Sequence, residues 1–344
     1  MIFTKKFHGS DQGDLEPIKS VKEQYLATED EEISQLRDQA IKENYKLRFV
    51  WKMVFFYSLI HLGGLIGFYQ FFFSAKWMTV IWTILLWGLS VLGITAGAHR
   101  LWSHKCYKAN TPLKLILVAM QTMAYQNDVI DWARDHRCHH KWTDTDADPH
   151  NVNRGFWFSH IGWLVTRKHP KIKEMGGKLD LSDLISDPIL MFQRRHYIPL
   201  VLLMCFFIPT IVPVFLWKET PMIAFFTAGL LRLCLALHSI FFVNSVAHTF
   251  GYRMYDINIS PTENFWMNVA TLGEGGHNYH HVFPQDYRTS ELTMFNVSVF
   301  NFTVGFIELF AKIGWAYDLK TTSKDVVMRQ VNKQLQLARK EKAG

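Results

Sequence analysis

The sequence Gly273-Glu-Gly-Gly-His-Asn-Tyr-His-His281 carries three histidines at positions i, i+3 and i+4. On a helix this spacing places all three imidazoles on one side, within reach of a common partner. The spacing recurs in His136-Arg-Cys-His-His140, and a further pair brackets His99-Arg-Leu-Trp-Ser-His104. The three clusters occupy 16 positions and hold eight of the 16 histidines among 344 residues, where random scatter would place roughly one. We therefore interpret them as parts of one metal site.

Long apolar runs separate the histidine clusters. Four runs are almost free of charge over about 20 residues or more, enough to cross roughly 30 Å of hydrocarbon as a helix. They are Phe49 to Phe73, Trp77 to Ala98, Tyr197 to Trp217 and Met222 to Ala247. In the fourth run we expect Arg232 to snorkel, its long stem carrying the charge towards the membrane surface. The sequence thus predicts an all-α membrane protein with four transmembrane helices and a cytosolic helical cap that holds the histidine-rich site.

The basic residues predict how the chain is oriented. Lysines and arginines are frequent between His99 and Arg195, whereas the short connections 74–76 and 218–221 carry one lysine each. Because cytosolic loops are rich in Lys and Arg, we expect the histidine clusters on the cytosolic side. We expect no nucleic-acid partner. Two crossings in each hairpin return all three clusters to that side. The four cysteines show no disulfide-framework spacing, which suits a reducing compartment.

This topology divides the chain into six segments. We expect a cytosolic N-terminal segment at 1–47, transmembrane hairpins at 48–98 and 197–247, cytosolic regions at 99–196 and 248–318, and a cytosolic tail at 319–344. Residues 113–126 are short for a span and predict an interfacial helix that roofs the site. Residues 292–313 are apolar enough to imitate a fifth span, but their polar residues favour a helix on the surface. These are Asn296, Asn301, Glu308 and Lys312.

The number of histidines bounds the number of metal ions. Asn244 and His248 lie i, i+4 on the last turns of the fourth run, at the membrane depth of His99, which adds a ninth histidine. A structural zinc closes with four ligands and a catalytic zinc needs three, so nine histidines fit two ions that keep open positions. Imidazole binds zinc, copper, iron and nickel alike, so spacing alone does not name the metal.

Carboxylates beside the clusters could accept the second ring N–H of a ligand and fix its tautomer. They are Asp128, Asp131, Asp135, Asp144, Asp146, Asp148 and Glu274. Each of them could equally be a solvated or turn-capping carboxylate.

Three longer stretches resemble the membrane acyl-CoA Δ9 (stearoyl-CoA type) desaturases. They are His99-Arg-Leu-Trp-Ser-His104, Trp132-Ala-Arg-Asp-His-Arg-Cys-His-His140 with the residues up to Asn151, and Gly273 to His281. We call these stretches, in chain order, the first, second and third histidine boxes. The resemblance runs from about Val50 to Asp318, and three boxes in this order are far more specific than any one of them. This resemblance, and not composition or spacing, implies a four-span enzyme of the endoplasmic reticulum with cytosolic termini and active site.

The resemblance also implies a di-iron centre and its reaction. Asn244 would contribute through water, and the ligands would be His99, His104, His136, His139, His140, His248, His277, His280 and His281. Such an enzyme introduces a cis double bond, most often Δ9, into a saturated fatty acyl-CoA such as palmitoyl- or stearoyl-CoA. It uses O2 and electrons from cytochrome b5, which NADH-cytochrome b5 reductase reduces. No His-Pro-Gly-Gly motif is present in the sequence, so we expect a separate electron donor.

Contacts with the substrate follow from the same resemblance. Coenzyme A carries several phosphate charges, so its headgroup needs a basic surface. The corresponding positions are Asn127, Arg134, Asp135, Arg167 and Lys168, and an anchor at the lipid headgroups is the competing interpretation for the Arg167-Lys168-His169 run. The closed end of the acyl tunnel would lie near Trp87 and Val91, and Phe241 stands where the family usually has a Trp near the kink.

Two other kinds of function stay open at the level of sequence. A desaturase of other regiochemistry, or a di-iron fatty-acyl hydroxylase, would use the same metals, and product analysis separates these from a Δ9 desaturase. A histidine-rich metal transporter would need ligands near mid-membrane, where only His61 and His238 lie. We interpret these two histidines as packed polar residues or tunnel lining.

Three Asn-x-Ser/Thr sequons test the orientation: Asn258, Asn296 and Asn301. Because we place all three in the cytosol, we expect none to be glycosylated when the chain is made in a eukaryotic host. A gel-shift assay after endoglycosidase treatment measures this. A sugar on Asn296 or Asn301 would indicate a fifth crossing or an inverted topology.

Overall fold

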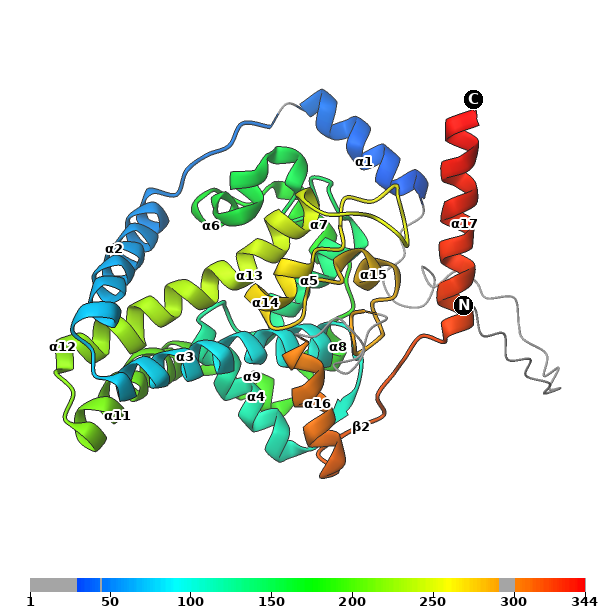
Figure 1. Ribbon diagram of the computed structural model, residues 1–344. Coiled ribbons are helices and arrows are strands. Elements are labelled where there is room, and N and C mark those ends of the chain that lie inside the picture. Colours follow the sequence, from blue (N-terminus) through cyan, green and yellow to red (C-terminus); the bar gives the residue numbers. More distant parts are fainter. Residues whose placement is uncertain (1–29, 44, 291–300, 344) are drawn as a thin grey trace.

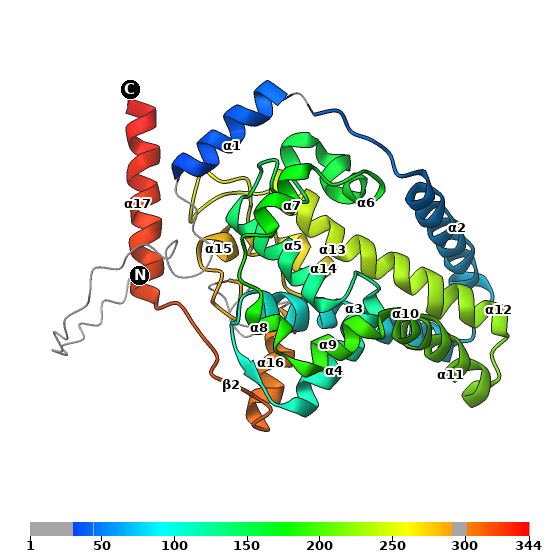
Figure 2. The ribbon, with the colours of Figure 1, turned by 180° about the vertical axis from the view of Figure 1, so that it is seen from behind.

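The computed structural model describes residues 30–43, 45–290 and 301–343, most of which are helical. Four helices are long and apolar enough to cross a membrane: Trp51–Phe73, Trp77–Ser103, Tyr197–Trp217 and Pro221–Thr249. They coincide with the four apolar runs of the sequence. Most of the shorter helices lie at one end of these spans, and the C-terminal helix Lys324–Ala343 stands at their edge (Figures 1 and 2). The predicted all-α fold with four candidate membrane helices is thereby confirmed.

Three of the four spans contain π-helical turns. The first span is α2 (Trp51–Phe73), and the second joins α3 (Trp77–Leu92) to the π-helix η2 (Gly93–Ser103). The third joins α10 (Tyr197–Val201), η5 (Leu202–Phe207) and α11 (Ile208–Trp217). The fourth joins α12 (Pro221–Ala224), η6 (Phe225–Leu231) and α13 (Arg232–Thr249). Such turns widen the helix and are frequent at functional sites.

The cap is built from short helices before, between and after the hairpins. Between the hairpins lie α4 (Thr111–Ala124), α5 (Val129–Lys141), η3 (Val152–Arg154), η4 (Phe158–Gly162), α6 (Trp163–Val165), α7 (Pro170–Gly176), α8 (Ser182–Ile185) and α9 (Pro188–Arg195). The others are α1 (Asp30–Glu43), α14 (Phe265–Thr271), α15 (His277–Val282), α16 (Phe302–Lys312) and α17 (Lys324–Ala343). The short strands β1 (Lys108–Ala109) and β2 (Ala316–Tyr317) pair antiparallel and hold the end of α16 beside the start of α4.

The structure describes all of segment 113–126 and part of segment 292–313, the two apolar segments whose relation to the membrane was ambiguous in the sequence. The helix expected over 113–126 is α4, which begins where the Asn110 side chain accepts a hydrogen bond from the backbone N–H of Leu113 and which packs against α3 and η2. Of the apolar segment 292–313, residues up to 300 lie outside the described residues. The remainder is α16, whose 11 residues are too short for a span. Asn301 is buried, with its side chain capping α16.

The two hairpin turns are tied together at the end of the molecule away from the cap. The carboxylate of Glu219 accepts hydrogen bonds from the backbone N–H of Lys76 at 2.8 Å and from the hydroxyl of Thr79 at 2.6 Å. The ammonium of Lys76 donates to the carbonyl oxygens of Trp217 and Lys218. Both turns therefore lie on one side, and both hairpins return to the other.

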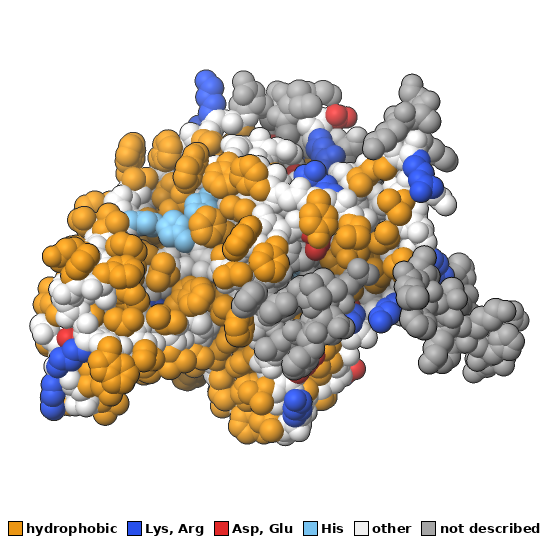
Figure 3. Space-filling view, viewed as in Figure 1, with side chains coloured by type: hydrophobic (Ala, Val, Ile, Leu, Met, Phe, Trp, Pro, Cys, Tyr) orange, Lys and Arg blue, Asp and Glu red, His pale blue; other side chains and the backbone are white. Residues whose placement is uncertain are grey.

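The first span meets the rest of the protein through glycines. Its other faces carry exposed hydrophobic side chains, and Figure 3 shows such side chains covering much of this part of the surface. Gly63, Gly64 and Gly67 are buried against η6 and the start of α13. A Cβ at Gly67 would lie 2.0 Å from the carbonyl oxygen of Phe226, so α2 can approach η6 this closely only without a side chain there.

Arg232 does not snorkel, which corrects the expectation from the sequence. Its side chain is fully buried, and its guanidinium donates to the carbonyl oxygens of Met123 at 2.7 Å and Cys205 at 2.5 Å. It also donates to the carbonyl of Ala228, one turn back in its own helix. The snorkelling expectation failed because it treated the fourth span as an isolated helix, whereas the neighbouring helices offer carbonyl acceptors within the membrane.

The glycine contact predicts a loss of stability on substitution. Gly67→Ala should lower the melting temperature of the purified protein in detergent by about 3–8 °C, because α2 must move away from η6. Thermal denaturation followed by fluorescence-detected chromatography measures this.

Gly88→Ala is the matched control, because a Cβ at Gly88 meets no atom within 4 Å and alanine favours the helix. Equal melting temperatures for the two variants would contradict the close contact of α2 with η6.

Candidate metal centre and substrate cavity

Five imidazoles from distant parts of the chain converge in what we call the first histidine group. It consists of His99 from η2, His104 directly after it, His136 and His140 from α5, and His280 from α15. One ring nitrogen of each lies within 4.8 Å of one from every other. The Nε2 atoms of His99 and His280 are 2.8 Å apart, as are those of His104 and His136. The nitrogens thus face a common centre.

Four further imidazoles form the second histidine group. They are His139 from α5, His248 from α13, and His277 and His281 from α15. The Nε2 atom of His277 lies 3.0 Å from that of His248 and 3.2 Å from that of His281. The structure therefore brings together all nine histidines singled out in the sequence, in two adjacent groups.

Helix geometry decides which histidine joins which group. Residues i and i+4 share a helix face, and His136 and His140 both belong to the first group. Consecutive residues point about 100° apart, so His139 belongs to the second group. In α15 the i, i+4 pair, His277 and His281, belongs to the second group, and His280 alone belongs to the first. The expectation that the three histidines of one box share a single partner is thus corrected, since each of these two boxes serves both groups.

The π-helix η2 explains the wider spacing of the first box. In an α-helix, residues five apart point in different directions, which would separate His99 from His104. Here the backbone N–H of His104 donates to the carbonyl oxygen of His99 at 3.1 Å, the i→i+5 bond of a π-turn. The two imidazoles lie with their centroids 4.9 Å apart and reach the same group.

Glycines let the third box pack against backbone. Gly273 has φ +128°, a conformation that favours glycine. A Cβ at Gly275 would lie 2.4 Å from the carbonyl oxygen of Asn264, and one at Gly276 would lie 2.3 Å from that of Thr289. Close approach at these points sets the position at which α15 begins.

Carboxylates and a hydroxyl orient several of the imidazoles from behind. Glu274 lies 3.2 Å from Nδ1 of His99, and Asp148 lies 3.0 Å from Nδ1 of His139. Nδ1 of His248 lies 2.7 Å from the hydroxyl of Ser260, with Asp144 further off at 3.8 Å. A proton on Nδ1 leaves the lone pair of Nε2 directed into the group.

The remaining flanking carboxylates have other partners. Asp128 caps α5, while Asp131 pairs with Arg134 and Asp146 with Arg154. Asp135 pairs with both Arg134 and Lys168. Of the seven carboxylates considered from the sequence, Glu274 and Asp148 contact an imidazole Nδ1 most closely.

Burial keeps most of the imidazoles neutral. It lowers the pKa of His104, His136 and His140 far below the ordinary value, and the neighbouring imidazoles add to this. The pKa of His280 and that of His281 fall for the same reasons, and the pKa of His277 falls to about 3. For His139 burial also lowers the pKa, but Asp148 outweighs it and the pKa is raised.

Glu274 stays ionised although it is buried. Burial alone would raise the pKa of its carboxyl, but Arg100 and His99 outweigh this and lower the pKa to about 2.

This donor set fits metal ions. Each group offers only imidazole nitrogens, most of them neutral, and no carboxylate lies among them. Metals that accept imidazole, such as zinc, copper, iron and nickel, suit such ligands. The Nε2 atoms of facing imidazoles lie 2.8 to 3.2 Å apart, and neutral lone pairs at such distances repel one another unless a cation or a proton lies between them. Both groups could therefore hold a metal ion.

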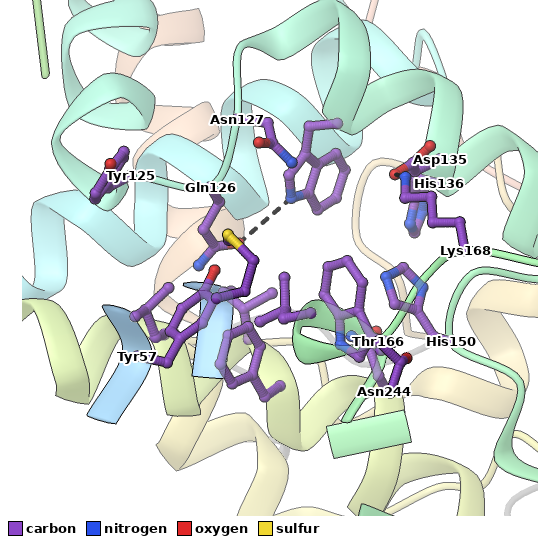
Figure 4. Close-up of a pocket in the computed structure, with 17 residues that line it drawn as sticks. Tyr57, Tyr125, Gln126, Asn127, Asp135, His136, His150, Thr166, Lys168 and Asn244 are labelled. Carbon is purple, nitrogen blue, oxygen red and sulfur yellow. Dashed lines mark hydrogen bonds and ion pairs between the residues drawn. The ribbon is translucent and has the colours of Figure 1, made fainter. Parts of the chain in front are cut away.

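A cavity of about 230 Å³ opens beside the first histidine group. Its walls come from α2, the α4–α5 connection, α5, α6 and α13, and Figure 4 shows their side chains directed towards one space. One end carries Asp135 and Lys168, and Tyr57 and Tyr125 lie at the other, where they pack against the apolar cluster that contains Leu237 (Figure 4). His136, a member of the first group, forms part of the wall. The cavity thus joins a charged mouth, the histidine group and an apolar interior.

A second and larger cavity continues outward from this mouth. It measures about 1120 Å³ and shares Asp135 and Lys168 with the first. Its lining includes Arg134, His169 and Lys173, beside apolar residues of α7 and α8.

The substrate contacts expected from the sequence fall into three places. Asn127, Asp135, Lys168 and Phe241 line the first cavity, and Arg134 lines the second. Asn244, expected to act on a metal through water, also lines the first cavity. Arg167 is exposed and lines neither. Trp87 and Val91 also line neither; they pack in the apolar cluster around Ile240, and the indole N–H of Trp87 donates to Ser239 at 3.1 Å.

His61 and His238 belong to neither histidine group. Their Nε2 atoms are 3.0 Å apart, and Nδ1 of His238 lies 3.0 Å from Nε2 of His160, a residue that the sequence did not single out. Nδ1 of His61 donates to the carbonyl oxygen of Tyr57 at 2.6 Å, and Nδ1 of His160 contacts the hydroxyl of Ser245. Neither His61 nor His238 lines the two cavities, so of the two earlier interpretations the packed polar residue holds.

Comparison with known proteins gives this geometry a family. The family model for fatty acid desaturases matches residues 75–295. The chain is 55% identical over 309 residues to the Delta(9)-fatty-acid desaturase fat-6 of Caenorhabditis elegans, covering 90% of each protein. It is 50% identical over 288 residues to the stearoyl-CoA desaturase of Homo sapiens, covering 84% of this chain and 79% of the human protein. It is 48% identical to the Acyl-CoA Delta(11) desaturase of Spodoptera littoralis, covering 88% of each.

The matched residues include all three histidine boxes, His248 and most of the residues that line the first cavity. Four membrane-length helices, two histidine groups and a cavity that reaches one of them accord with these matches. This chain belongs to the fatty acid desaturase family and is a membrane desaturase.

Proposed function

We propose that this desaturase introduces a cis double bond at Δ9 of a saturated fatty acyl-CoA such as palmitoyl- or stearoyl-CoA. The observation that carries this is the first cavity, which connects a charged mouth to an apolar interior along a wall that includes His136. Acyl-CoA has the matching polarity, with a charged headgroup and an apolar chain. The names of the nematode and human relatives support Δ9 and stearoyl-CoA.

We propose two iron ions as the cofactor, held by the nine histidines, with Asn244 acting through water. The division of the nitrogens into two adjacent groups supports two ions. Asn244 lies one helical turn before His248 in α13 and lines the first cavity, which supports its role. When bound, iron supplies the activation of O2, so that with two electrons and two protons O2 becomes two waters while the acyl chain loses two hydrogens.

The chain's own residues position the acyl group and exclude water. The indole of Trp132 is held by a hydrogen bond to Gln126 and stacks on His136, so it fixes one wall beside the first group. Phe241 and Ile240 form the facing wall from α13. A methylene pair confined between these side chains stays close to the histidine groups in a site that excludes water.

Basic residues at the mouth would hold the coenzyme A headgroup. Lys168 and Arg134 both contact Asp135, and burial would raise the pKa of that carboxyl, but the two cations outweigh this and lower it. Asp135 therefore stays ionised and keeps both cations at the junction of the cavities, where phosphates can meet them. Asn127 contributes a polar group on the same wall. For Arg167, which is exposed, we propose contact with the outer part of the headgroup.

We infer cytochrome b5 as the electron donor, reduced by NADH-cytochrome b5 reductase, and the endoplasmic-reticulum membrane as the location. The excess of Lys and Arg on the side of the cap supports a cytosolic active site, with the termini and segments 1–47, 99–196, 248–318 and 319–344 on that side. Hairpins 48–98 and 197–247 would then cross the bilayer, in accord with the turns tied together at the far end.

Transport of metal ions has less support. Among the described residues, no group of three metal-ligating side chains includes His61 or His238, and the nine histidines lie at one end of the spans. Hydroxylation, or a double bond elsewhere, would use the same site, and relatives named for Delta(11) and Delta12 desaturation are about as similar to this chain as the human protein. Product analysis therefore decides between these reactions.

Expression in a desaturase-deficient host tests the reaction. We expect new monounsaturated fatty acids of 16 or 18 carbons with the double bond at Δ9, located by mass spectrometry of derivatised chains. Hydroxylated products, or a double bond only at another position, would contradict the proposal.

Removal of one imidazole tests the metal centre. His280→Ala should lower turnover at least about 100-fold and reduce bound iron, because His280 faces two other ligands of the first group at 2.8 and 3.0 Å. Metal analysis of the purified protein, beside turnover with reduced cytochrome b5, measures both effects.

The matched control is His196→Ala, because the side chain of His196, just after α9, contacts Phe192 one turn back and lies outside both cavities. Full iron content in His280→Ala would remove this histidine from the ligand set.

A further inference from the structure

One histidine in the cavity wall has no assigned task. His150 follows the second box, is only 8% exposed, and lines the first cavity beside His136 and Thr166. Its Nδ1 is buried, and no group in the described part of the chain forms a hydrogen bond with it. Figure 4 shows the imidazole of His150 directed into the cavity, opposite Asp135 and His136. Buried polar atoms in proteins are nearly always paired with protein, ordered water or a ligand, and a ligand in the cavity can supply the partner of this nitrogen.

The indole of Trp163 repeats this feature next to His150. Its Nε1 is also buried without a partner among the residues that the structure describes, and Trp163 lines the same cavity. The two rings meet edge to face, with centroids 4.3 Å apart. Two rings in contact, each with a polar atom that has no partner among the described residues, therefore form part of one wall.

The backbone holds His150 in this position independently of the ring. The N–H of His150 donates to the carboxylate of Asp148 at 2.9 Å, in a turn whose Asp148 also orients His139. The imidazole is thus presented by a fixed loop, while its Nδ1 stays free for a ligand.

The position of the pair along the cavity indicates what it binds. His150 lies at the same end of the cavity as Lys168 and Asp135 (Figure 4). Trp163 packs against the apolar cluster that contains Leu237 and Phe241. In an acyl-CoA the thioester marks the change from polar to apolar, and its carbonyl oxygen is a hydrogen-bond acceptor. An indole N–H can only donate, and an imidazole N–H can donate beside it.

We propose that His150 and Trp163 donate hydrogen bonds to the thioester carbonyl oxygen of the substrate. This inference rests on the proposed function, because it takes acyl-CoA as the ligand. The pair acts as a positioning device: it fixes the carbonyl at one point of the wall, and the number of carbons between that point and the histidine groups then sets which methylene pair reaches them.

A ligand without the carbonyl oxygen tests the proposal. Dissociation constants are measured for stearoyl-CoA and for S-octadecyl-CoA, the thioether in which a CH2 replaces the carbonyl, using the full-length metal-loaded protein in nanodiscs. The natural protein should bind the thioester about 10-fold more tightly. In His150→Phe, which keeps a ring against Trp163, this ratio should fall to near one. In Trp163→Phe it should take an intermediate value.

His196→Phe is the matched control, because His196 lies outside both cavities, and its ratio should equal that of the natural protein. An unchanged ratio in both His150→Phe and Trp163→Phe would overturn the proposal. Equal weakening of both ligands would assign the pair to a pantetheine amide and also overturn it. Loss of metal in His150→Phe would make His150 part of the metal centre, since it can form a third group with His139 and Asp148.

Failure of the proposed function would give a different result. In that case the natural protein would bind neither ligand, before any substitution in the wall is considered.

Discussion

A buried arginine joins the first histidine box to the third. Arg100 is fully buried in η2, and its guanidinium donates to Glu274 at 2.9 Å and to the carbonyl oxygens of Gly273 and Tyr287. Glu274 in turn contacts Nδ1 of His99. Buried charges of this kind persist only when they are paired, and loss of one partner is strongly destabilising. The first histidine group takes ligands from both joined segments, so its geometry depends on this contact.

The sequence predicts the spans and the nine histidines but not how the histidines are divided. Hydropathy gives the spans because a membrane helix must be apolar over its whole length. The two groups were not predictable, because neighbours such as His139 and His140 differ only in their direction around α5. The spacing of His99 and His104 becomes intelligible only through the π-turn, which no pattern of apolar residues encodes.

The cavity wall was the least predictable part, since it is made by contacts between distant segments. Nothing in the sequence distinguishes Trp163 from other helix residues or His150 from other loop residues. That a ring nitrogen of each is buried without a partner is seen only in the structure. For Trp87 and Val91 the role at the tunnel end stays a prediction. The family resemblance puts them at the end of a tunnel, but in this chain they pack around Ile240, one residue behind the wall.

Arg232 has a consequence for how the protein enters the membrane. A charged side chain in mid-span costs about 2.5–3.5 kcal/mol during insertion, so the fourth span is released into lipid less readily than its hydropathy suggests. Its carbonyl acceptors belong to Met123 and Cys205, both translated earlier. The ribosome thus delivers the acceptors first, and the guanidinium meets them as its helix leaves the translocon. Insertion of the fourth span therefore depends on contacts with helices that are already in place.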